Sequence, residues 1–201
     1  MENNIEDLRH IRSMMERSTR FLSLSGISGV AAGSFAILGA LAAQMVIWGK
    51  FSITHSLTID FIIIALIVLF CACTSGLYFS IKKAQKNKSK FWIGPTWQIV
   101  KDFAVPMVTG GIFSLILIYN GLGYMVGSAT LIFYGLALFS AGDRTYKDIK
   151  ILGLCEIFLG LLSGVSIGWG LLIWAVGFGL LHIVYGIVIY IKYDAPKKSV
   201  N

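Results

Sequence analysis

Long uncharged runs alternate with short charged connections along this chain. Asp, Glu, Lys and Arg are absent from four runs, Phe21–Gly49, Phe61–Ile81, Phe103–Gly142 and Ile157–Ile191. A helix needs about 20 apolar residues to cross a bilayer, so the last two runs are long enough for more than one crossing. Both contain small polar turn residues, at Tyr119–Tyr124 and at Ser163–Trp169. The pattern predicts six spans, at about 21–48, 57–81, 96–119, 122–142, 148–166 and 168–191.

Composition supports a membrane protein over a soluble one. Of 201 residues, 56% are hydrophobic and 13% are charged, which is more apolar surface than a soluble domain of this size can bury. We therefore expect an all-α, polytopic six-transmembrane-helix bundle over residues 21–191. Residues 1–20 have apolar positions at helical spacing and predict an amphipathic helix on the cytoplasmic surface. Residues 192–201 are expected to form a cytoplasmic tail.

The net charge of +7 is distributed unevenly between the two ends of the predicted spans. Sixteen of the 17 Lys and Arg residues lie at the termini or in alternate connections, and only Lys50 lies on the other side. Basic residues concentrate on the cytoplasmic side of membrane proteins, so both termini are predicted to be cytoplasmic. This distribution explains the charge without a nucleic-acid partner.

A lysine-rich connection follows the second predicted span. Five lysines gather there beside Phe91 and Trp92: Lys82, Lys83, Lys86, Lys88 and Lys90. Such a cluster attracts anionic headgroups at about 1 kcal/mol per basic residue. Ordinary topological charge explains the same lysines, and both interpretations stay open.

Small residues recur within the predicted spans. GxxxG pairs occur at Gly29 and Gly33, at Gly123 and Gly127, and at Gly160 and Gly164. Small residues allow helix backbones to approach closely in lipid, so these positions predict tight helix packing, either within the chain or between the protomers of an expected homodimer.

The chain also contains two weak internal similarities. Residues 29–34 are similar to residues 123–128, and residues 71–77 are similar to residues 155–161. These pairs match span 1 with span 4 and span 2 with span 5, in opposite orientations. Inverted repeats of this kind are typical of transporters.

Glu156 is a carboxylate inside an apolar run, where an ionisable group is costly and usually serves a pathway or a pair. Its expected neighbours at similar depth are His182 on the last span, Tyr134 on span 4, and the stretch of span 3 that begins at Thr109. The first interpretation is a site for a proton, an ion or another ligand. The alternative is a structural hydrogen-bonded tie between spans 5 and 6.

Motifs for catalysis, metals and cofactors are missing from the sequence. There is no HExxH, no Walker loop and no pair of intramembrane aspartates, so we expect no enzyme activity. The three cysteines lie within spans and do not indicate a disulfide framework. A haem site would require a second intramembrane histidine. We therefore expect no metal and no cofactor.

Both ends of the chain resemble a family of bacterial multi-pass membrane proteins. Residues 11–30 and residues 168–193 carry that resemblance, and the glycine-punctuated hairpins of residues 110–191 are similar in texture to acid-resistance membrane proteins of the HdeD type. The resemblance implies a bacterial inner-membrane protein and assigns no activity. The leading hypothesis is movement or binding of a small solute or ion. The alternative is a membrane-embedded sensor or scaffold that holds a cytoplasmic partner through residues 1–20 and the lysine-rich connection.

Overall fold

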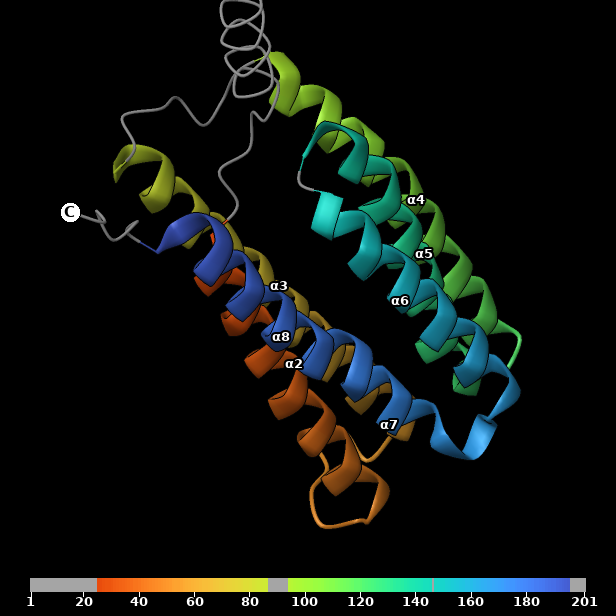
Figure 1. Ribbon diagram of the computed structural model, residues 1–201. Coiled ribbons are helices and arrows are strands. Elements are labelled where there is room, and N and C mark those ends of the chain that lie inside the picture. Colours follow the sequence, from red (N-terminus) through yellow and green to blue (C-terminus); the bar gives the residue numbers. More distant parts are fainter. Residues whose placement is uncertain (1–24, 87–93, 146, 196–201) are drawn as a thin grey trace, which may run out of the picture.

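The computed structural model describes residues 25–86, 94–145 and 147–195, and within these ranges the chain is helical and has no strand (Figure 1). This confirms the all-α class. The amphipathic helix predicted at residues 1–20 lies outside the described residues, as do Lys88, Lys90 and residues 196–201.

Six long helical segments follow one another in the described residues. The first five are α2 (Gly26–Ile47), α3 (Leu57–Lys86), α4 (Gly94–Tyr119), α5 (Val126–Ala141) and α6 (Lys147–Val165). The sixth, called the last helix below, runs over Gly170–Asp194 and consists of α7 (Gly170–Trp174), the π-helical η4 (Ala175–Leu181), α8 (His182–Ile189) and the π-helical η5 (Tyr190–Asp194). Three 3₁₀ turns precede α5, α6 and α7: η1 (Gly123–Met125), η2 (Gly142–Arg144) and η3 (Ile167–Trp169).

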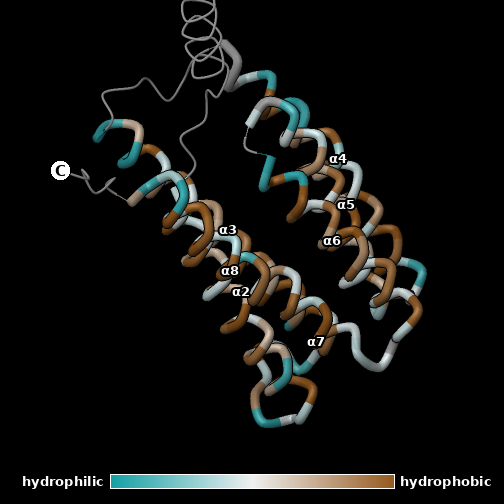
Figure 2. Tube along the Cα trace, viewed as in Figure 1, coloured by the Kyte–Doolittle hydropathy of each residue, from teal (hydrophilic) through white to brown (hydrophobic). Residues whose placement is uncertain are grey.

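Five of these helical segments are long and apolar enough to cross a membrane, which identifies a membrane protein but corrects the predicted number of six. The exception is α6. It has 19 residues, but Lys147, Asp148, Lys150 and Glu156 make it too polar by composition. Figure 2 shows hydrophobic residues through the middle of the helices and hydrophilic residues gathered near their ends.

The helices form two layers of three (Figure 1). In the first layer α2 packs between α3 and the last helix, and in the second α5 packs between α6 and α4. Exchanging α2, α3 and α4 with α5, α6 and the last helix gives the same order of neighbours, and the suggested repeat stays a prediction. The last helix contacts α5 and α6 across the layers. We call the end with Ser25, Lys86 and Asp194 the terminal end, and the opposite end the loop end.

The glycines of α2 lie where this helix crosses the last helix. A Cβ atom built on Gly33 would lie 2.5 Å from the carbonyl oxygen of Gly179, and one on Gly29 would lie 3.0 Å from the Cα atom of Gly186. The first distance leaves no room for a side chain, and the second would require the two helices to move apart slightly. The sequence left open whether the seam was internal or between protomers, and the structure places it within the chain.

The other GxxxG pairs differ from one another. A Cβ on Gly160 would lie 2.6 Å from Ile132 Cγ1, and one on Gly164 would lie 3.0 Å from the hydroxyl oxygen of Ser128. That hydroxyl donates a hydrogen bond of 2.6 Å to the Gly160 carbonyl, which ties α5 to α6. Gly127 has only looser neighbours, and around Gly123 nothing lies within 4 Å.

A buried carboxylate organises the connection between α2 and α3. Asp60 is 1% exposed, and its two oxygens accept hydrogen bonds from the Ser52 hydroxyl, the Ile53 amide, and both the amide and the hydroxyl of Thr54, over 2.6–3.1 Å. The same loop holds His55 at φ 60°, and the His55 amide donates to the Ser52 hydroxyl. Asp60 thus satisfies the polar groups of this turn at the loop end.

Asp60→Asn is expected to destabilise the protein, because an amide nitrogen cannot accept the hydrogen bonds that one carboxylate oxygen accepts. The loss should be about 2–3 kcal/mol, since hydrogen bonds to charged groups are the stronger class. The midpoint of thermal unfolding in detergent measures it. The matched control is Asp143→Asn, at a carboxylate that is 68% exposed. Equal midpoints for the two variants would contradict this role of Asp60.

Candidate functional site

Glu156 lies near the middle of α6 and is completely buried, with 0% of its surface exposed. Among the described residues, neither oxygen of its carboxylate has a hydrogen-bond donor. This is unusual, because buried polar groups in folded proteins nearly always have a partner. Asp60 differs in this respect, because its oxygens accept four hydrogen bonds, whereas both oxygens of the Glu156 carboxylate are buried without a donor in the described part of the chain.

His182, at the start of α8 in the other layer, is an ionisable group close to Glu156. Its Nδ1 atom lies 3.3 Å from Glu156 Oε1, but it makes its hydrogen bond with the Gly177 carbonyl, at 3.1 Å. His182 is 6% exposed, so this contact between the layers is buried. The structure thus brings together the two residues that the sequence placed at similar depth.

Tyr134 on α5 completes the cluster. Its hydroxyl oxygen lies 2.8 Å from Nε2 of His182. The Tyr134 ring also contacts Phe103 of α4 and Phe178 of the last helix, with ring centroids 6.0 and 5.0 Å apart. Phe178 stacks on the imidazole of His182. Aromatic rings from α4 and the last helix therefore pack against the Tyr134 and His182 side chains of the polar cluster.

The π-helical stretch η4 explains how the carboxylate fits. Gly177 lies in this stretch, and a Cβ atom there would be 2.5 Å from Oε2 of Glu156 and 2.6 Å from Leu131. A Cβ atom on Gly179 would be similarly close to a side chain of α2. Isolated π-helical turns are frequent at functional sites. The hydrophobic pattern predicted one unbroken span at 168–191, and Gly177 was not among the predicted site residues, although Gly177 and Gly179, two residues apart in this span, were a signal.

The hydrogen bonds define how protons can be arranged in this cluster. A neutral His182 with hydrogen on Nδ1 donates to the Gly177 carbonyl and accepts from the Tyr134 hydroxyl, so both ring nitrogens are satisfied without Glu156. Burying an ionised carboxylate that lacks a donor costs far more than burying a neutral carboxyl group. The arrangement suits a Glu156 carboxyl that carries a proton in this conformation and loses it when water or a rearranged His182 reaches it.

The remaining predicted site residues lie apart from this cluster. Thr109 is exposed, and its hydroxyl donates to the Val105 carbonyl of its own helix. Lys83 pairs with Asp194, and Lys82 lies over the ring of Tyr78. In the described ranges, no group of three or more His, Cys, Asp or Glu side chains is arranged to hold a metal ion.

Gly177→Ala is expected to destabilise the protein by about 2 kcal/mol, because the added methyl group overpacks a site between two buried side chains. In a Glu156→Ala background one of those side chains is gone, so the effect should shrink by about 1 kcal/mol, the size of coupling expected between contacting residues. Thermal unfolding of the four proteins in detergent gives the coupling. Around Gly168 nothing lies within 4 Å, so Gly168→Ala is the control. An unchanged Gly177→Ala effect in the two backgrounds would separate Gly177 from Glu156.

Comparisons with protein families, with curated proteins and with solved structures found no match to this chain. The family resemblances of its sequence stay predictions, and a function has to be inferred from the cluster of Glu156, His182 and Tyr134.

Proposed function

We propose that this membrane protein moves a proton through the cluster of Glu156, His182 and Tyr134, alone or together with a small solute. The observation that carries the proposal is the Glu156 carboxylate, fully buried in a bundle of apolar helices and without a donor. Ionisable groups in such places mark proton relays and ion pathways.

The contacts of His182 support a relay. Its imidazole lies between a group that can hold a proton and a hydroxyl that can pass one on, at 3.3 Å from Glu156 and 2.8 Å from Tyr134. Histidine gains and loses a proton near neutral pH more easily than any other side chain. A small rotation of the ring away from Gly177 would direct Nδ1 to the carboxylate.

We further propose that α6 also crosses the membrane, which brings the number of spans to six. We propose that the terminal end faces the cytoplasm of a bacterial cell. α6 lies alongside α5 in the second layer, and its excess charge has two sources: Lys147, Asp148 and Lys150 at its start, and Glu156. The proposed role of Glu156 in proton movement accounts for the presence of that charge within the helix. The uneven distribution of Lys and Arg supports the orientation.

Proton movement is tested with purified protein in sealed vesicles that contain a trapped pH-sensitive dye. After an imposed pH difference, with the membrane potential clamped, vesicles with protein should equilibrate faster than empty vesicles. Equal rates over a range of protein densities would contradict movement of a proton alone. Adding candidate solutes to the same vesicles then tests coupled movement, and no acceleration by any of them would contradict the proposal.

A further inference from the structure

The last five residues of the last helix connect both layers at the terminal end. η5 carries Lys192, Tyr193 and Asp194 in succession. Asp194 contacts the first layer, whereas Lys192 and Tyr193 contact the second. This short π-helical segment therefore makes ion pairs and hydrogen bonds with both layers.

Asp194 anchors η5 to the first layer. One of its oxygens accepts a 2.8 Å hydrogen bond from the amide of Gly26, at the start of α2, and the other lies 2.5 Å from Nζ of Lys83 on α3. The side chains of Lys83 and Asp194 are only 13% and 9% exposed. η5 is thus held in place relative to both of the helices beside it.

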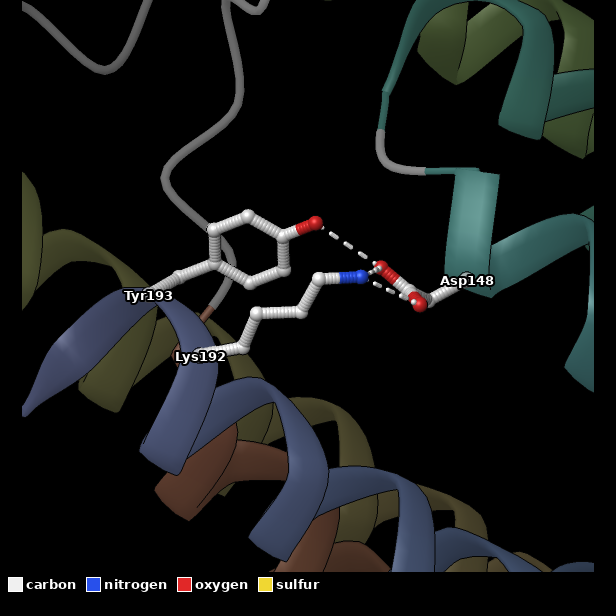
Figure 3. Close-up of polar contacts among 3 residues, drawn as sticks. All are labelled: Asp148, Lys192 and Tyr193. Atoms are coloured by element: carbon white, nitrogen blue, oxygen red, sulfur yellow. Dashed lines mark hydrogen bonds and ion pairs between the residues drawn. The ribbon is translucent and has the colours of Figure 1, made fainter.

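Lys192 and Tyr193 reach the second layer at a single carboxylate. Nζ of Lys192 lies 3.0 Å from both oxygens of Asp148, and the Tyr193 hydroxyl donates to one of them at 2.9 Å (Figure 3). Asp148 lies in the first turn of α6. Figure 3 shows the two side chains extending from the last helix toward α6.

The same two helices carry the site. Asp148 and Glu156 are eight residues apart on α6, about 12 Å along its axis. Their partners on the last helix are Lys192 and His182. Leu152 lies one turn from each acid and is 6% exposed. Movement of α6 away from the last helix at the terminal end would separate Asp148 from Lys192 and expose the buried face of α6 that carries Leu152 and Glu156.

We propose that Asp148, Lys192 and Tyr193 form a latch that closes the terminal end of the bundle and controls the access of water to Glu156. The inference rests on the proposed function in one respect, that the route closed by the latch leads to the proton site. The structure has the latch closed. Opening replaces its three hydrogen bonds with water and requires the two layers to tilt apart at this end only.

The latch is tested by the labelling of a buried cysteine. Leu152→Cys is introduced in a protein whose native Cys71, Cys73 and Cys155 are replaced by alanine, and a small charged methanethiosulfonate, which reacts only through water, is added. Lys192→Met should speed labelling at position 152 about tenfold, the effect expected when hydrogen bonds to a charged group are lost. The charge exchange Asp148→Lys with Lys192→Asp should restore slow labelling.

Leu117→Cys is the matched control, because Leu117 is 7% exposed and lies near the loop end of α4. Its labelling should not respond to Lys192→Met. Equal acceleration at both positions would show general loosening, and no acceleration at position 152 would show that the latch does not limit access. Either result overturns the inference. The readout does not involve proton movement, so a failure of the proposed function would leave the labelling pattern unchanged.

Discussion

Glu156→Gln is expected to reduce proton movement to the rate of empty vesicles while the protein still folds. Glutamine has nearly the same volume as glutamate and keeps a hydrogen-bonding head group, but it cannot bind or release a proton at neutral pH. Stability should remain near that of the unchanged protein or rise, because an unsatisfied carboxylate is removed from a buried site. Flux in dye-loaded vesicles and the midpoint of thermal unfolding measure the two quantities.

His182→Gln should also abolish flux, and the double variant with Glu156→Gln should be no worse than either single one, since residues that act as one unit are not additive. Asp143→Asn is the control, because it neutralises an exposed acid outside the cluster. The opposite pattern, with stability lost and flux retained in Glu156→Gln, would assign Glu156 to a structural tie. The geometry already disfavours such a tie, because His182 has hydrogen-bond partners in Gly177 and Tyr134.

The largest loss of stability is expected for Gly33→Ala, about 3 kcal/mol, the upper part of the usual range for overpacking. The new Cβ atom would lie 2.5 Å from the carbonyl oxygen of Gly179 and 2.9 Å from the amide nitrogen of Ile183. These are backbone atoms and cannot turn aside as a side-chain end can. α2 and the last helix would have to separate, which also moves η4 and the site.

Gly111→Ala is the matched control on α4. Around Gly111 nothing lies within 4 Å, so the same substitution meets no neighbour. Alanine is favoured over glycine in a helix by about 1 kcal/mol, so this variant should become slightly more stable. The two substitutions should therefore shift the midpoint of thermal unfolding in opposite directions. Shifts of the same sign and size would mean that the α2 seam is not tightly packed.

Hydrophobic pattern was sufficient to predict where the helices are. The predicted span 57–81 lies within α3 (Leu57–Lys86), and the predicted span 96–119 ends with α4 at Tyr119. Charged and turn-forming residues mark these ends, because such residues cost little free energy at a helix terminus and much within lipid. The predicted span 148–166 likewise coincides with α6 (Lys147–Val165), although α6 is not among the helices apolar enough to cross a membrane.

The small residues of α2 showed that a close helix contact exists, but their partner could not be read from the sequence. Any of the other helices could have supplied the opposing surface, since glycine pairs recur along the chain. The tertiary structure assigns it to the last helix, where Gly179 and Gly186 offer bare backbone opposite Gly33 and Gly29. That match depends on crossing angle and register, which are set by all the contacts together.

The sequence by itself determined the environment of this protein, the helical segments, and the presence of a costly acid and a histidine at similar depth. It did so because hydropathy and the expense of burying charge are properties of single residues and their near neighbours. The tertiary structure decided that Tyr134 reaches His182, that a π-helical turn makes room for Glu156 beside Gly177, and that η5 joins the layers at Asp148. Those features depend on distances between residues far apart in the chain, and such distances follow only from the packing of the whole bundle.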